Sequence, residues 1–370
     1  MARVLVLGGL SESLINFRGA LLKEMVVRGH EVFACAPNAT EDVRVGLSQI
    51  GAMYRHVELN RTGINPIRDV QTVKDLMALF RSVRPDVFFG YTIKPVIYGS
   101  LVARMTDVSR IYSMVTGLGY AFSRHSLKSK VVGNGAVALY RLALRYNRHV
   151  FFQNPDDLRL FLEKRLVHFP GQAVLVNGSG VDVDAFRPAS YPKTISFLLI
   201  ARLIRDKGIY EYVEAARRVR GRFPEIRFRI AGWIDPNPNA IDRDDLERWR
   251  KEGVVEYLGR LTDVRPAIAN CSVYVLPSYR EGTPRTVLEA MAMARPVITT
   301  DAPGCRETVQ EGRNGFLVPV QDVASLVEAM ERFVEQPRLV EKMGRVSREI
   351  AVKKYDVRKV NRVLLETMGL

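Results

Sequence analysis

The sequence predicts an α/β protein of two doubly wound domains, each built on a parallel sheet, that face a central cleft. Three observations lead to this prediction. The chain has 370 residues, which suits two domains of about 150 to 200 residues each. Short apolar runs alternate with amphipathic stretches, as buried parallel strands alternate with helices. The series then starts a second time after the segment FRPASYPKT at 186–194.

The first series predicts six buried strands, with helical patterns between most of them. They are RVLVL (3–7), EVFACA (31–36), DVFFG (86–90), RIYSMV (110–115), HVFFQN (149–154) and AVLVN (173–177). The second series predicts five more, which are ISFLLIA (195–201), IRFRIAG (226–232), VVEYLG (254–259), SVYVLP (272–277) and PVITT (296–300). Ligands of open parallel sheets bind outside the carboxyl ends of the strands. We therefore expect the site in the loops that follow these strands.

The segment 186–194 is typical of a linker, because it holds two prolines and a serine between the two series. We place the first domain at 1–188 and the second at 189–354. The last stretch, 355–370, has a helical period and belongs to neither sheet. We expect it to cross back onto the first domain.

Cysteine usage predicts a reducing compartment. Cys35, Cys271 and Cys305 are odd in number and far apart, and no C-x-x-C spacing occurs. Neither a disulfide framework nor a cysteine metal site is expected. The start MARVLVLGGLSES shows no secretory signal pattern, and its apolar run is too short to span a membrane. We expect a cytoplasmic protein.

The net charge of +15 is unevenly spread. Residues 90–148 carry nine Lys or Arg against one acid, Asp107. Such a segment favours an anionic partner, either a membrane surface, a phosphorylated substrate or nucleic acid, although it also suits a basic surface that serves only solubility. Nucleic acid is the weaker alternative because no recognisable binding module accompanies the charge. The stretch 126–152 mixes basic residues with Val, Leu and Tyr, as an interfacial helix does.

The stretch YREGTPRTVLEAM (279–291) places two carboxylates around a turn and a helix start. Thr283 suits the N-cap and Pro284 the first helical position. The first-turn amides, of Arg285 and Thr286, would then form an anion site together with the helix dipole.

Gly282 lets a ligand approach the backbone of this turn closely. Glu281 precedes the cap, and Glu289 lies about one and a half turns into the helix. Carboxylates at an anion site are explained if they accept hydrogen bonds from sugar or ribose hydroxyls. The alternative is that Glu281 is a surface loop acid and Glu289 a solvated helix residue.

Two further strand ends carry candidate binding residues: two cations follow one strand, and a glycine that a ligand could approach closely follows the next. In FLLIARLIRDKG, Arg202 follows the strand and Lys207 precedes Gly208, which suits a diphosphate. Gly232, in AGW, allows close approach at the next strand end. The loop in YLGRLTD (257–263) is placed where a base could stack or hydrogen bond.

The order A-R-x4-K-G, A-G, L-G-x3-D and P-S-x-x-E-G-x-P-x-x-x-L-E-A-M-A resembles the retaining glycosyltransferases of family 4, whose GT-B fold has two Rossmann-like domains. The resemblance covers nearly the whole chain. It implies that Glu281 contacts the donor sugar, that Glu289 holds the ribose, and that Arg202 and Lys207 neutralise the leaving diphosphate. It implies no metal and no other cofactor, because cations of the protein serve the diphosphate.

The first domain would hold the acceptor in this family. Gly8 and Gly9 could meet the diphosphate or the acceptor. Many members carry a histidine where this chain has Thr116. The forms VTGLGYAF (115–122) and YTIKPVIYGS (91–100) look similar to a subgroup that extends polyprenyl-diphosphate-linked oligosaccharides, of the N-acetylgalactosaminyl or hexosyl type. Lys94 is the candidate contact for the acceptor phosphate.

Two D-x-D pairs imitate a metal motif. Asp182 and Asp184 resemble a structural interdomain motif of the family. Asp242 and Asp244 suit a helix start, where acids complement the dipole. No metal role is expected for either pair.

The sequence therefore predicts a retaining hexosyltransferase that uses a UDP-hexose or UDP-N-acetylhexosamine. Its acceptor would be a lipid-linked saccharide at an anionic membrane, with the protein peripheral on the inner face. The alternatives are transfer to a soluble sugar or another lipid, a nucleotide-sugar 2-epimerase, and a basic membrane or nucleic-acid binding protein with an inactive transferase core.

Overall fold

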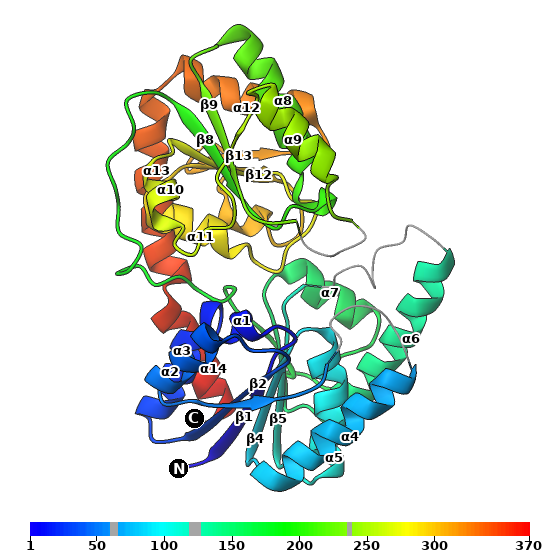
Figure 1. The fold of residues 1–370 in the computed structure, drawn as a ribbon. Coiled ribbons are helices and arrows are strands. Elements are labelled where there is room, and N and C mark those ends of the chain that lie inside the picture. The colour runs from blue at the N-terminus through cyan, green and yellow to red at the C-terminus, as the bar shows by residue number, and fades with distance from the viewer. Residues whose placement is uncertain (60–65, 118–126, 235–238) are drawn as a thin grey trace. The chain divides into compact units, whose positions relative to one another are not determined.

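A computed structural model describes residues 1–59, 66–117, 127–234 and 239–370, and the chain divides into two compact units (Figure 1). Unit 1 comprises residues 1–179 and 359–370, and unit 2 comprises residues 180–358. Each unit is a parallel sheet with helices on both faces. The predicted pair of doubly wound α/β domains is confirmed.

The sheet of unit 1 has seven strands in the order β3-β2-β1-β4-β5-β6-β7. The strands are β1 (Arg3–Leu7), β2 (Glu31–Ala36), β3 (Met53–His56), β4 (Val87–Tyr91), β5 (Arg110–Val115), β6 (His149–Phe152) and β7 (Ala173–Leu175). The helices are α1 (Ser11–Asn16), α2 (Gly19–Val27), α3 (Glu41–Gln49), α4 (Pro66–Val83), the π-helical turn η1 (Pro95–Gly99), α5 (Ser100–Met105), α6 (Leu127–Leu144), α7 (Pro155–Glu163) and α14 (Val357–Met368), which begins in unit 2. The strand order reverses between β1 and β4.

The sheet of unit 2 has six strands in the order β10-β9-β8-β11-β12-β13. The strands are β8 (Ser196–Ile200), β9 (Arg227–Ala231), β10 (Glu256–Tyr257), β11 (Val273–Leu276), β12 (Val297–Thr300) and β13 (Gly315–Val318). The helices are η3 (Arg205–Lys207), α8 (Ile209–Arg222), α9 (Arg243–Lys251), α10 (Arg265–Ala269), α11 (Arg285–Ala292), η4 (Arg306–Thr308), α12 (Val323–Glu335), α13 (Arg338–Ile350) and η5 (Ala351–Tyr355). The order reverses between β8 and β11.

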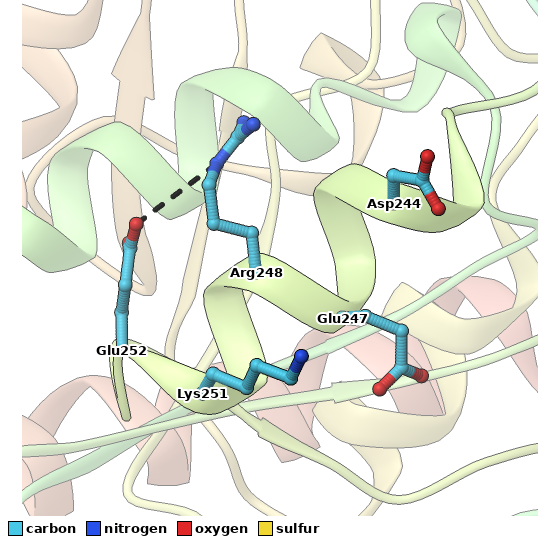
Figure 2. A pocket seen from close by; sticks show the side chains of 5 residues that line it. All are labelled: Asp244, Glu247, Arg248, Lys251 and Glu252. Atoms are coloured by element: carbon cyan, nitrogen blue, oxygen red, sulfur yellow. Dashed lines mark ion pairs between the residues drawn. The ribbon is translucent and has the colours of Figure 1, made fainter.

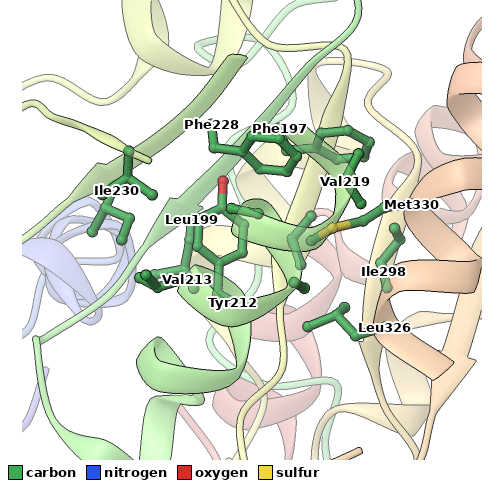
Figure 3. Packing of buried hydrophobic residues seen from close by; sticks show 14 of the residues in the cluster. Phe197, Leu199, Tyr212, Val213, Val219, Phe228, Ile230, Ile298, Leu326 and Met330 are labelled. Atoms are coloured by element: carbon green, nitrogen blue, oxygen red, sulfur yellow. The ribbon is translucent and has the colours of Figure 1, made fainter. Parts of the chain in front are cut away.

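Both faces of the unit 2 sheet are buried, and β8 shows how. Phe197 and Leu199 pack into one hydrophobic cluster, whereas Leu198 and Ile200 pack into another. Successive side chains of a strand point to opposite faces, so a strand covered on both sides reads as a continuous apolar run. Figure 3 shows the first cluster, in which Tyr212 of α8 lies among these strand residues.

Two strands were not predicted, and both lie at sheet edges. β3 (MYRH) ends on exposed Arg55 and His56, so it lacks the apolar run of a buried strand. β13 (GFLV) has four residues and begins with a glycine. An edge strand pairs on one side only, and its composition is correspondingly less constrained.

The chain passes between the units earlier than predicted. The division falls after Ser179 rather than at 188, because Val181 and Val183 pack into a core cluster of unit 2. The chain crosses back after Arg358. From there α14 adds Leu364 and Leu365 to the unit 1 cluster that also contains residues of α2 and α3, beside which α14 is drawn in red in Figure 1.

The basic segment contributes α6, whose first turns adjoin residues outside the described part of the chain. Among the helices that the structure describes, none combines the length and the apolar character needed to cross a bilayer.

Arg295 binds the backbone of the segment that precedes the second sheet, at Ala189 and Ser190. Its side chain is fully buried, and its guanidinium donates hydrogen bonds of 2.8–3.0 Å to the carbonyls of Ile268, Ala269, Ala189 and Ser190. A planar guanidinium with five donors suits such a cluster of carbonyls. Removing it would leave several buried acceptors without a donor.

We therefore predict that Arg295→Met lowers the stability of unit 2 by about 3 kcal/mol or more. Thermal unfolding of the full chain by calorimetry measures the shift. The matched control is Arg313→Met, because Arg313 is exposed and its guanidinium donates to the side chain of Gln310 at 2.8 Å. We expect that control to stay within about 0.5 kcal/mol of the parent. Equal shifts in unfolding temperature for both variants would show that the hydrogen bonds of Arg295 do not stabilise unit 2.

Candidate active site

The candidate site lies at the carboxyl ends of β8 and β11, where the strand order of unit 2 reverses. Such a switch point is where open α/β sheets bind ligands. Arg202 and Lys207 follow β8, and Glu281 follows β11. Because β8 and β11 are paired neighbours, residues about 80 positions apart in sequence meet at one sheet edge.

Lys207 and Glu281 form an ion pair between Nζ and Oε1. Their side chains are 15% and 14% exposed. Partial burial weakens solvent screening, so this contact is stronger than an exposed surface pair. The sequence analysis predicted that the two side chains contact different parts of one ligand. It did not predict that they contact each other.

The two loops are also joined through their backbones. The carbonyl of Asp206 accepts hydrogen bonds from Tyr279 N at 2.9 Å and from Ser278 Oγ at 3.0 Å. Gly208 has a φ of 70°, and a Cβ there would collide with the carbonyl of Pro277. The glycine after Lys207 is therefore needed both for its left-handed backbone and for the close approach of the β11 loop.

A third loop, which follows β12, contacts the backbone of Glu281. This contact was not predicted from the sequence. Glu281 N donates to the carbonyl of Pro303 at 2.9 Å. Gly304 has a φ of 82°, and a Cβ there would collide with the carbonyl oxygens of Glu281 and Gly282. Burial raises the pKa of the neighbouring Cys305 thiol to about 12, so it stays protonated. The Pro-Gly pair at 303–304, shortly after the predicted strand 296–300, indicates a turn but not its contact with Glu281.

The helix after Glu281 starts one residue later than predicted. α11 begins at Arg285, and Pro284 occupies the N-cap with an extended backbone, φ −72° and ψ 108°. Thr283 is therefore not the N-cap, and Pro284 is not the first helical residue. The first turn still contains Arg285 and Thr286, and Thr286 Oγ1 donates to the carbonyl of Ile200 at 3.2 Å, which ties α11 to the end of β8.

Glu289 is buried, with 5% of its surface exposed, so it is not a solvated helix residue. Its carboxylate pairs with Arg285 Nε at 2.8 Å, one turn earlier in α11. Burial raises the pKa of Glu289, and the nearby Arg285 opposes that shift. The start of α11 therefore presents Arg285 together with a largely desolvated carboxylate.

Gly232 joins the ends of three neighbouring strands. It has a φ of 148°, and a Cβ there would collide with the carbonyl of Ala201. Gly232 N donates to the carbonyl of Gly259 at 2.8 Å, and Tyr257 donates to the Gly232 carbonyl at 2.8 Å. Gly232 is thus in close contact with the backbone of the neighbouring strand end. Its hydrogen bonds hold the loop at 257–263, where a base was predicted to bind.

In unit 1, Gly8 follows β1 at the switch point between β1 and β4. Gly8 and Gly9 are buried, and a Cβ on Gly8 would collide with the ring and hydroxyl of Tyr91. The Tyr91 hydroxyl also lies 2.7 Å from Ser13 Oγ. The small size of Gly8 therefore already has a structural reason.

Lys94 Nζ donates to Asp69 Oδ1 at 2.6 Å, and these side chains are only 12% and 10% exposed. Lys94 thus has a counter-ion on α4 that the sequence analysis did not identify. Thr116 is half-buried just after β5. Its loop continues into 118–126, so the rest of the predicted VTGLGYAF contact lies outside the described residues.

The first aspartate of each D-x-D pair accepts hydrogen bonds from nearby backbone amides. Asp182 Oδ1 accepts from the amides of Asp184 and Ala185, each at 3.0 Å. Asp242 caps α9 and accepts from Asp244 N at 3.0 Å. In the part of the chain that the structure describes, no cluster of three His, Cys, Asp or Glu side chains is arranged to hold a metal ion.

A surface pocket lies on α9 and contains none of the predicted site residues. Figure 2 shows the five charged residues that line it: Asp244, Glu247, Arg248, Lys251 and Glu252. Arg248 and Glu252 approach to 3.9 Å across it. It is a run of exposed ion pairs along one helix, which contributes little binding energy.

Both halves of the chain match known protein families. Residues 17–178 match the family described as "Glycosyl transferase 4-like domain", and residues 194–336 match "Glycosyl transferases group 1".

Two relatives are similar over most of their length. One is N,N'-diacetylbacillosaminyl-diphospho-undecaprenol alpha-1,3-N-acetylgalactosaminyltransferase of Campylobacter jejuni, at 24% identity over 341 residues and 88% of each chain. The other is UDP-Gal:alpha-D-GlcNAc-diphosphoundecaprenol alpha-1,3-galactosyltransferase of Escherichia coli, at 24% identity over 74% of this chain and 72% of the relative. The crystal structure of Anabaena Alr3699/HepE in complex with UDP and glucose shares the fold, with a TM-score of 0.79, 16% identity and 100% coverage of both chains.

We predict that Gly304→Ala displaces the Glu281 loop and destabilises unit 2, whereas Gly312→Ala costs only the left-handed backbone strain. Gly312 is the matched control because its φ of 69° is similar and a Cβ there meets nothing within 4 Å. We expect Gly304→Ala to lose at least about 1 kcal/mol more than the control, measured by thermal unfolding. Equal losses would show that the β12 loop does not support Glu281.

Proposed function

We propose that this chain, a glycosyltransferase with the GT-B fold whose halves match a glycosyl transferase 4-like domain and a group 1 domain, transfers a hexose or N-acetylhexosamine from a UDP-sugar to a polyprenyl-diphosphate-linked saccharide. Two relatives whose names specify diphospho-undecaprenol acceptors support the acceptor class. The observation that supports the donor proposal is the Lys207–Glu281 ion pair at the switch point, with Arg202 after β8 and the start of α11 after β11.

Each group at this edge then has a role in the donor site. Arg202 and Lys207 would neutralise the diphosphate, with help from the amides and dipole of the α11 start. Glu281 would accept hydrogen bonds from the donor sugar, and Glu289 from the ribose. Departure of a nucleoside diphosphate develops negative charge, which fixed cations stabilise without a metal ion.

The configuration at the reacting carbon would be retained in this proposal. The acceptor hydroxyl would attack from the face that the diphosphate leaves, and the departing phosphate would take the hydroxyl proton. Unit 1 would supply the acceptor contacts, from Gly8, Gly9, Lys94 and Thr116. Lys94 would exchange its Asp69 partner for a phosphate of the acceptor, at the cost of uncovering that carboxylate.

An anionic membrane surface is the proposed location, on the cytoplasmic side. Leu139 and Leu142 of α6 are 39% and 45% exposed. Arg141 on the same helix and Arg145, which directly follows the helix, are also exposed. Exposed leucines beside arginines suit the interface of an anionic leaflet, where each basic residue contributes about 1 kcal/mol. The docking would be weak and reversible.

The test is release of UDP, or of another nucleoside diphosphate, from a panel of nucleotide sugars. Each is assayed alone, with soluble sugars, and with a short polyprenyl-diphosphate-linked sugar in vesicles of neutral or anionic phospholipid. We expect release from one UDP-sugar that depends on the lipid acceptor and is faster in anionic vesicles. UDP release only with a soluble sugar would refute the lipid-linked acceptor. Epimerisation of the nucleotide sugar without any acceptor would overturn the transferase proposal.

Lys207→Met in the same assay should lower kcat by about a hundredfold. Lys251→Met is the matched control, since Lys251 is an exposed lysine at the end of α9. It should leave the rate unchanged. Full activity of the Lys207 variant would refute the donor-site assignment.

The Lys207–Glu281 ion pair leads to a further prediction about product binding. A diphosphate must compete with Glu281 for Lys207, so Glu281→Gln should bind UDP more tightly, by about fivefold or roughly 1 kcal/mol, while losing turnover. Isothermal titration calorimetry with UDP measures this. Asp206→Asn removes an exposed acid next to Lys207 and controls for simple charge repulsion.

In a Lys207→Met background, adding Glu281→Gln should leave the UDP affinity nearly unchanged, because the lysine for which UDP and Glu281 compete is already absent. Weaker UDP binding by Glu281→Gln, or equal tightening by Asp206→Asn, would refute the competition.

A further inference from the structure

A hydrogen bond between Tyr279 and Glu211 links the two loops of the candidate donor site. The Tyr279 hydroxyl donates to Glu211 Oε1 at 2.6 Å in a partly buried setting. Glu211 lies in the first turn of α8, and Tyr279 lies in the loop after β11. A hydrogen bond to a charged acceptor is about twice as strong as one between neutral groups.

The two residues flank the ion pair in sequence. Glu211 is four positions after Lys207, and Tyr279 is two positions before Glu281. The same loop segments share the backbone hydrogen bond from Tyr279 N to Asp206 O at 2.9 Å. The hydrogen bond between Tyr279 and Glu211 therefore adds a side-chain contact where the main chains are already joined. The Lys207–Glu281 ion pair connects the same two segments of the chain.

The carboxylate of Glu211 lowers the stability of the fold at this position. Its Oε2 is buried and has no hydrogen-bond partner in the described part of the chain. A buried, half-satisfied carboxylate costs stability, so a purely structural contact would be served as well by an apolar pair. Burial, followed by the bond to Glu211, raises the pKa of Tyr279 to about 12, and the phenol thus remains a donor at neutral pH.

We propose that Tyr279, through its hydrogen bond to Glu211, is a positioning residue that holds Lys207 and Glu281 in the geometry needed for the donor. This inference rests on the proposed function and deepens it. Tyr279 itself is not assigned a contact with the substrate. Its hydroxyl sets the separation between the loop that carries the cation and the loop that carries the carboxylate, and misplacing either loop weakens stabilisation of the leaving diphosphate.

The test compares Tyr279→Phe with Tyr210→Phe in the full chain. Tyr210 is the matched control because its hydroxyl also donates to a carboxylate, Asp245 Oδ2 at 2.7 Å, but this bond joins α8 to α9 and not to the β11 loop. We expect Tyr279→Phe to lower kcat of sugar transfer about tenfold with KM for the UDP-sugar within about twofold. Tyr210→Phe should leave both parameters near their parent values.

Glu211 variants separate positioning from simple destabilisation. Glu211→Gln keeps an acceptor for the phenol and should retain kcat within about threefold, whereas Glu211→Leu should match Tyr279→Phe. The double variant of Tyr279→Phe and Glu211→Leu should be no slower than either single variant, since both remove one interaction. Additive losses, or a Tyr279→Phe kcat within twofold of the parent, would overturn the proposal.

Hydrogen exchange provides a readout that does not depend on turnover. Tyr279→Phe should speed amide exchange in peptides that cover 204–211 and 279–284, and Tyr210→Phe should not. If the parent chain transfers no sugar from any donor, the proposed function fails, and the exchange result alone decides whether Tyr279 holds the loops. Unchanged exchange in both peptides would overturn the positioning role.

Discussion

Parallel strand pairing is the constraint on which the rest of this molecule depends. Every parallel strand must be followed by a crossover, so all carboxyl ends collect at one edge of each sheet. Where the order reverses, the crossover after β8 leads to β9 on one side and the crossover after β11 leads to β12 on the other side. The loops that begin these two crossovers are joined by the hydrogen bond from Tyr279 N to the carbonyl of Asp206. The Lys207–Glu281 ion pair depends on this reversal.

Each unit holds predicted site residues as internal ion pairs. Lys207 pairs with Glu281, Arg285 with Glu289, and in unit 1 Lys94 with Asp69. All three pairs are at least partly buried, where an uncompensated charge would be costly. A ligand that carries both phosphates and hydroxyls can replace both members of such a pair at once. An anion alone would satisfy the cation and leave the carboxylate without a partner.

Most of the fold could be predicted because its signals are local, and the same signals indicate the strand ends that carry the candidate site residues. Buried strands read as apolar runs, and Glu281 to Glu289 follow one strand and open one helix. The edge strands β3 and β13, the Asp69 partner of Lys94 and the Gly304 support could not be predicted in the same way. They depend on long-range neighbours: Gly304 matters because of the Glu281 carbonyl, and nothing in its own surrounding sequence specifies that contact.

The two places where the chain enters and leaves unit 2 are bonded to each other. Val181 N donates to the carbonyl of Tyr355 at 2.8 Å, and Val357 N donates to the carbonyl of Val181 at 2.9 Å. Unit 2 thus has adjacent ends, as an inserted domain does, and unit 1 is completed by residues synthesised after it. During synthesis, unit 1 therefore receives its last helix, α14, only after every residue of unit 2 has been made.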